Sequence, residues 1–111
     1  MGLTKSDLFT EEQNTLAGIA KVLGHPARIA ILQYLLNSKD CINTDLVKET
    51  GLAQATISQH LKELKACNLI HGTISGNSMN YCINVVKWNE VSAAIADFFN
   101  LYDSSNLKNC C

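Results

Sequence analysis

Hydrophobic residues recur at helical spacing along most of this chain. Ile57, Leu61 and Leu64 are separated by four and three positions, so they share one face of a predicted helix. A shorter amphipathic helix is predicted just before it, and Gly51 joins the two. Residues 43–67 therefore predict a helix-turn-helix.

The hydrophobic period changes after the second of these helices. Asn68 tolerates the left-handed conformation that follows a helix end, so it predicts where this helix stops. Residues 69–73 and 79–85 are rich in β-forming side chains, and residues 75–78 supply turn chemistry between them. A β-hairpin is therefore expected over 69–85, as the wing of a winged helix.

Two more helices are predicted at the ends of the chain. Residues 11–23 place Leu16, Ile19 and Leu23 at helical spacing, and Thr10 with Gln13 resembles a capping box. Residues 88–102 carry a seam of large apolar side chains over four turns: Trp88, Val91, Ile95, Phe98 and Tyr102. One side of this last helix is expected to pack on the core. A chain of this size has little further core to bury the rest.

A central buried helix is predicted over residues 26–37. Pro26 suits a first helical turn, and the apolar residues that follow cover more than one face. Arg28 is the one charged residue there. Its head either lies in solvent, with its stem packed, or contacts a phosphate or forms an ion pair that positions the motif.

Composition indicates one folded domain over residues 1–111. Hydrophobic residues make up 47% of the chain and charged residues 17%, which excludes a disordered chain. No stretch has the length of a membrane span, and the N-terminus does not resemble a secretory signal, so a cytoplasmic location is expected. The five cysteines show no tight spacing and suit a reducing compartment. An enzyme is not expected, because glycine-rich phosphate loops, usefully spaced carboxylate pairs and Cys-x-x-Cys are missing from the sequence.

Polar side chains lie on the side of the second helix opposite its apolar stripe. They can hydrogen-bond to base edges or phosphates of double-stranded DNA, and the hairpin can reach the flanking backbone or the minor groove. The alternative is the ordinary solvated face of a surface helix. The candidate DNA contacts are Gln54, Thr56, Ser58, Gln59, His60, Lys62 and, at the hairpin tip, Asn77.

Residues 23–85 resemble the arsenic-repressor (ArsR/SmtB) family of dimeric winged-helix repressors. The matching residues are Leu23, His25, Pro26, Arg28, Ile31, Leu32, Asp45, Leu46, Gln54, Ile57, Ser58, His60, Leu61, Leu69 and Tyr81. The resemblance implies a mainly helical winged helix-turn-helix with a small hairpin. It also implies a homodimer whose interface is formed by the first and last helices, and which would bind an inverted-repeat operator.

The charge of the chain is unusual for a DNA-binding protein. Nine Lys plus Arg against ten Asp plus Glu give a net charge of −1. DNA affinity depends largely on phosphate neutralisation, so modest affinity per subunit and a shallow salt dependence are expected. The alternative is a winged-helix module that binds another protein and does not contact DNA directly.

The inducer cannot be a metal bound in the way the resemblance implies. The Cys-x-Cys pair of the family is replaced by Ile42 and Thr44, and residues 85–102 contain no histidine. Three thiols remain as candidate ligands for arsenic(III), antimony(III) or a soft metal, or as targets of an oxidant: Cys41, Cys110 and Cys111. The alternative, with no constitutive cofactor, is that the tail cysteines have no role and Cys41 packs as a small hydrophobe. Cys67 and Cys82 are expected to pack, and Cys67 with His71 makes only a weak metal pair.

Overall fold

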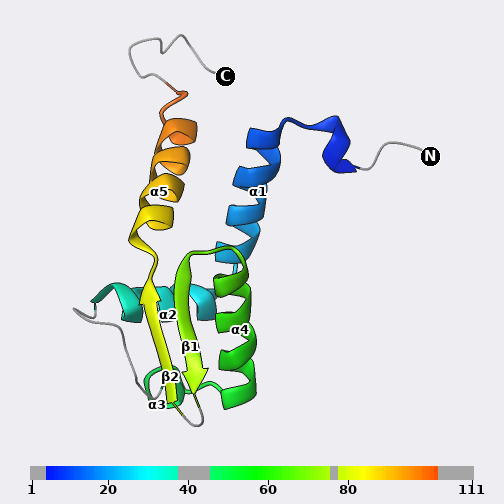
Figure 1. Cartoon of the computed structure of the whole chain (residues 1–111). Coiled ribbons are helices and arrows are strands. Elements are labelled where there is room, and N and C mark those ends of the chain that lie inside the picture. Colours follow the sequence, from blue (N-terminus) through cyan, green and yellow to red (C-terminus); the bar gives the residue numbers. More distant parts are fainter. Residues whose placement is uncertain (1–4, 38–45, 76–77, 103–111) are drawn as a thin grey trace, which may run out of the picture.

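The computed structural model describes residues 5–37, 46–75 and 78–102 of the chain (Figure 1). A short 3-10 helix, η1 (Lys5–Leu8), precedes α1 (Glu11–Leu23) and α2 (Pro26–Asn37). The helix-turn-helix consists of α3 (Leu46–Thr50) and α4 (Gln54–Ala66), and residues 43–45 of its predicted span lie outside the described part. The antiparallel hairpin of β1 (Ile70–Ser75) and β2 (Ser78–Ile83) leads into α5 (Val85–Phe99).

The core lies where α2, α3, α4 and the hairpin meet, and Ile19 of α1 and Val91 of α5 also belong to it. The predicted stripe of α4 is confirmed, because Ile57, Leu61 and Leu64 are all 0% exposed. Ile31 of α2 and Leu69 before β1 are buried with them. Helices α1 and α5 extend together beyond this part of the molecule (Figure 1). The fold thus separates a compact motif from two projecting helices.

Helix ends form as the sequence predicts. Thr10 caps α1, since its hydroxyl accepts from the backbone N–H of Gln13 at 3.0 Å and the side chain of Gln13 accepts from the N–H of Thr10 at 2.9 Å. Asn68 has φ +65°, as expected for the residue just past the end of α4. The N–H of Leu69 donates to the carbonyl of Leu64 at 3.2 Å, which completes a Schellman motif.

The hairpin and the last helix differ from the prediction at their ends. Ser75 pairs with Ser78, so the hairpin turns over residues 75–78 as predicted, but the strands extend further toward the turn than residues 73 and 79. Val85 was expected in the second strand but begins α5, because Asn84 caps the helix by accepting from the N–H of Lys87 at 3.2 Å. Tyr102 lies beyond the end of this helix.

None of the described helices has, by itself, the length and apolar character of a membrane span. Helices α1 and α2 reach that length and composition only when joined, across a bend of 89°.

Candidate nucleic-acid interface

The outer face of α4 presents small and polar side chains to solvent. Gln54, Thr56, Gln59 and Lys62 are exposed, and Ser58 is half-buried. The buried stripe on the opposite side holds the helix in place. A surface of this shape and chemistry fits base edges in a major groove, which admits an α-helix. The role of each of these residues in DNA binding stays a prediction.

Two side-chain amides of α4 form hydrogen bonds to other side chains of the same helix. The side-chain amide of Gln54 donates to the hydroxyl of Ser58 at 3.3 Å. That of Gln59 donates to the carboxylate of Glu63 at 3.1 Å. These bonds lie on the exposed surface, where water competes for the same groups, so exchanging them for bonds to a base costs little.

His60 has a different setting from the other candidate residues. It is half-buried, and its Nδ1 accepts a hydrogen bond from Nε–H of Arg28 at 3.1 Å. Burial, the nearby charge of Arg28 and that of His25 lower the pKa of His60 below its usual 6.5. Any contact of His60 with DNA therefore has to use Nε2.

The head of Arg28 is hydrogen-bonded within the chain, which differs from the solvent-exposed head and from the phosphate contact or ion pair expected from the sequence. Besides its bond to His60, it donates from Nη1 to the backbone carbonyl of Val22 at 3.2 Å. Its head is thus bound to neighbouring helices, although the partner is a neutral imidazole and not the acid of an ion pair. No local sequence pattern joins Arg28 with His60, because they are far apart in the chain. The contribution of His25 was missed for the same reason.

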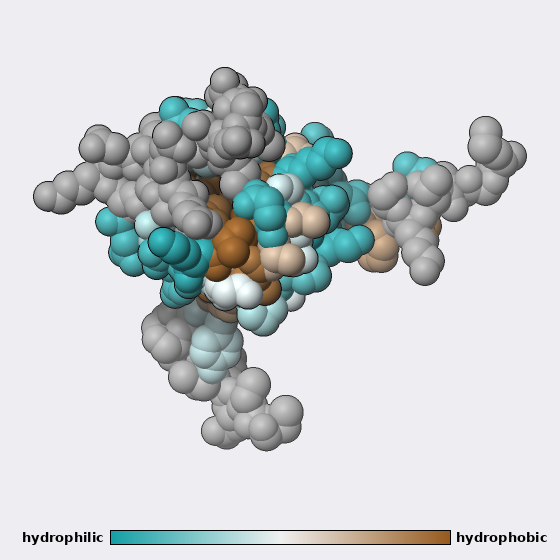
Figure 2. Space-filling model, turned by 90° about the horizontal axis from the view of Figure 1, so that it is seen from below, coloured by the Kyte–Doolittle hydropathy of each residue, from teal (hydrophilic) through white to brown (hydrophobic). Residues whose placement is uncertain are grey.

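The hairpin lies beside α4, and β1 packs against that helix (Figure 1). Viewed from below, the described surface is mostly hydrophilic, with one hydrophobic area near its centre (Figure 2). Asn77, the predicted contact at the hairpin tip, lies outside the described residues. The structure therefore places the backbone of the hairpin beside α4, and the contact of Asn77 with DNA stays a prediction.

The candidate thiol ligands Cys41, Cys110 and Cys111 all lie outside the described residues. Within the described part of the chain, no three histidine, cysteine or acidic side chains gather in a way that could hold a metal ion.

The remaining two cysteines lie within the described part. Cys67 is a free, half-buried thiol that donates to the carbonyl of Leu64 at 3.2 Å, as expected for a packing role. Cys82 is half-buried but disulfide-bonded, so the expectation that it only packs is wrong. Its position in a strand predicted its burial and could not reveal a bond to a cysteine elsewhere in the chain.

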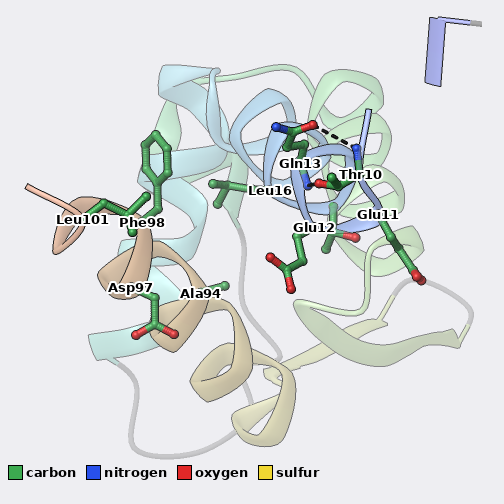
Figure 3. A pocket seen from close by; sticks show the side chains of 10 residues that line it. Thr10, Glu11, Glu12, Gln13, Leu16, Ala94, Asp97, Phe98 and Leu101 are labelled. Carbon is green, nitrogen blue, oxygen red and sulfur yellow. Dashed lines mark hydrogen bonds between the residues drawn. The ribbon is translucent and has the colours of Figure 1, made fainter. Parts of the chain in front are cut away.

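A second surface lies between α1 and α5, away from the candidate DNA-binding face. Leu16 of α1 points toward Phe98 of α5, and Leu101 lies beside Phe98 (Figure 3). Phe98 is 53% exposed and Leu101 is 79% exposed. The carboxylates of Glu11, Glu12 and Asp97 also line this groove. Trp88, Val91 and Ile95, by contrast, pack against the core, so the predicted seam of α5 is divided between core and open surface.

Residues 25–71, which include the helix-turn-helix and the Arg28–His60 pair, match the family described as "Bacterial regulatory protein, arsR family". This part of the chain is similar to the ArsR family. This confirms the resemblance found in the sequence. The family is one of regulators, as are the relatives described below, and not of enzymes.

Curated relatives of this chain carry regulator names. The HTH-type transcriptional repressor SmtB of Mycobacterium tuberculosis is 38% identical over 63 residues, which cover 57% of this chain and 46% of SmtB. The HTH-type transcriptional regulator CmtR of Mycobacterium bovis is 31% identical over 71 residues, covering 64% of this chain and 59% of CmtR. The chain thus spans about half the length of these relatives.

Solved structures share the fold over most of the chain. An ArsR family transcriptional regulator, RHA00566, superposes with a TM-score of 0.69 at 23% identity, covering 86% of this chain and 98% of that one. The homodimeric winged helix-turn-helix DNA-binding domain of Mb0332 from Mycobacterium bovis gives 0.58 at 17% identity, covering 98% and 99%. The chain is therefore a winged helix-turn-helix, mainly helical with a two-stranded hairpin.

Proposed function

We propose that this chain is an ArsR-family protein and a homodimeric, sequence-specific transcriptional repressor that binds double-stranded DNA through α4. One observation carries the proposal. Ile57, Leu61 and Leu64 anchor α4 completely in the core, while the opposite face of the same helix is open to solvent beside a hairpin. The regulator names of SmtB and CmtR support the same role.

The exposed glutamines are the groups we assign to base recognition. A glutamine amide can donate and accept together, which matches the N6 and N7 edge of adenine. Gln59 lies in the middle of the exposed face, and Ser58 next to it can bond either a base or a phosphate. Lys62, one turn further along the helix, is exposed and suits a phosphate.

The groove between α1 and α5 is the surface we assign to the homodimer. Exposed aromatic and aliphatic side chains gather there, and a monomer of this size gains stability by covering them. A two-fold pair would present two copies of α4 to successive major grooves, about 34 Å apart. The operator is therefore proposed to be an imperfect inverted repeat. The cytoplasm is the proposed place of action.

A mobility-shift assay tests the proposal. The probes are a duplex from the region upstream of the chain's own gene and an unrelated duplex of equal length and base composition. The repressor account expects a shift of the upstream duplex at protein concentrations that leave the unrelated duplex unshifted. No preference between the probes would contradict sequence-specific binding. No shift of either probe would favour the protein-interaction module that the low positive charge suggests.

A further inference from the structure

The guanidinium of Arg28 joins three helices. It lies in the first turn of α2, donates to Nδ1 of His60 on α4, and donates to the carbonyl of Val22 in the last turn of α1. Helix α1 belongs to the proposed dimer surface and α4 to the proposed DNA-binding surface. One side chain therefore connects the two surfaces.

The link requires one protonation state of His60. A guanidinium has donors only and stays protonated, so Nδ1 of His60 has to offer a lone pair. The proton of the neutral ring is then on Nε2. A second proton would go to Nδ1, where it would remove the acceptor and set an imidazolium against the guanidinium. Protonation and the Arg28 bond exclude each other.

The surroundings of His60 favour its neutral form. Besides Arg28, the ring of His25 lies close, with its centroid 5.8 Å from that of His60. Burial, Arg28 and His25 all lower the pKa of His60. Other titratable groups on the described elements packed against α4 do not contribute to that shift: Tyr34 on α2, Lys48 and Glu49 on α3, and His71 on β1.

We propose that Arg28 is a positioning residue for the DNA-binding surface, which ties α4 to α1 only while His60 is neutral. This inference rests on the proposed DNA-binding function and adds a regulation by acid. Protonation of His60 would free α4 from α1, disturb the placement of its outer face and weaken operator binding. The folded state favours the neutral ring, so the link stabilises the fold above about pH 6.5 and is lost as the pH falls below it.

The sign of the pH effect separates this role from a simple contact. A histidine that faced a phosphate would become positive in acid and would strengthen DNA binding. A histidine that anchors α4 through Arg28 would weaken binding on the same change. Both roles predict a change of DNA affinity in the same pH range, so the direction of that change distinguishes them.

Fluorescence-anisotropy titrations of the upstream duplex from about pH 7.5 to about pH 5.5 test the proposal on the full chain. The His60→Asn variant places a carbonyl oxygen near the position of Nδ1 and does not titrate. Wild-type affinity should fall relative to this variant, by at most about tenfold per pH unit because one proton is linked. His71→Gln is the matched control and should keep the wild-type profile. A wild-type affinity that rises in acid relative to His60→Asn, or runs parallel to it, would overturn the proposal.

Nuclear magnetic resonance of the free protein tests the hydrogen bond without DNA. The ring of His60 should carry its proton on Nε2 at neutral pH, and Arg28→Met should raise the pKa of His60 because a neighbouring positive charge is removed. Arg28→Lys is the matched control, because it keeps the positive charge and should raise the pKa of His60 less than Arg28→Met does. A proton on Nδ1 would overturn the link itself.

The two experiments fail in distinguishable ways. Absence of DNA binding by the wild type at every pH would overturn the proposed function and the positioning role with it. DNA binding with the expected tautomer but a flat pH profile would overturn the positioning role alone.

Discussion

Gly72 of β1 lies directly opposite Tyr81 of β2 in the hairpin. Its φ of +155° is one that side chains rarely adopt, and a Cβ there would overlap the carbonyl oxygen of Asn80 and lie 2.9 Å from Cα of Tyr81. Tyr81 is itself buried, so the strand cannot move away easily. The geometry of the wing therefore depends on the absence of a side chain at this position.

The Gly72→Ala variant is expected to be destabilised by about 1–3 kcal/mol, the usual cost of a strained backbone conformation. Urea denaturation followed by circular dichroism measures the free energy of unfolding. Gly18→Ala is the matched control, because Gly18 lies inside α1 with nothing within 4 Å of an added Cβ. That control should be stabilised by up to about 1 kcal/mol. Equal stability of Gly72→Ala and the wild type would contradict the close approach.

Much of the fold could be predicted from sequence because its signals are local. The stripe of α4, the cap at Thr10 and the helix end at Asn68 each depend on residues a few positions apart. The start of α5 was missed because Val85 and Val86 are β-branched and follow a strand. The helix begins at Val85 because Asn84 caps it. This cap could not be recognised from the sequence, since asparagine is equally common in turns.

The α1–α5 groove yields a prediction about assembly. Phe98→Ser and Leu101→Ser should shift the dimer toward monomer at a given concentration, because each removes exposed apolar area that a second copy would cover. Sedimentation velocity measures the shift. Leu36→Ser is the control, since this leucine of α2 is also well exposed, at 46%, but does not line the groove. A wild-type monomer at all concentrations, or equal dissociation of all three variants, would count against the interface.

The scarcity of positive charge predicts a shallow salt dependence of DNA binding. The described helix-turn-helix contains three lysines, Lys48, Lys62 and Lys65. The negative charges of Glu49 and Glu63 offset two of these positive charges. Log affinity falls by about 0.9 per phosphate contact for each tenfold rise in salt. Titrations at several salt concentrations should give a slope that corresponds to fewer than about eight contacts per dimer. A steeper slope would show that basic groups outside this count reach the DNA.

A thiol-reactive inducer would have to act through cysteines whose placement the structure does not describe. If arsenite lowers the affinity of the protein for its operator once the disulfide of Cys82 has been reduced, the triple serine variant of Cys41, Cys110 and Cys111 should keep its affinity in arsenite. The reason is that arsenic(III) binds about three thiolates. Thiol titration before and after one equivalent of arsenite checks that the ion is bound. If arsenite lowers the operator affinity of the serine variant as well, these cysteines are excluded as the sensor.

From the sequence, the candidate DNA-binding site could be predicted only as an exposed helix face, without the contacts that other helices make with it. Helical periodicity places Gln54 and Gln59 outside because it places Ile57 and Leu61 inside, and both placements are confirmed. The setting of His60 could not be read in the same way. Its partner Arg28 comes from another helix, and only the packing of α2 against α4 brings them together.

The proposed function depends on recognition of DNA by the outer face of α4. The most direct test compares the dissociation constant of the upstream duplex for the wild type and for the Ser58→Ala, Gln59→Ala double variant. A loss of about 1–3 kcal/mol is expected for each base contact removed. Gln33→Ala, an exposed glutamine of α2, should bind like the wild type. Unchanged binding by the double variant, with its fold intact by circular dichroism, would contradict the claim.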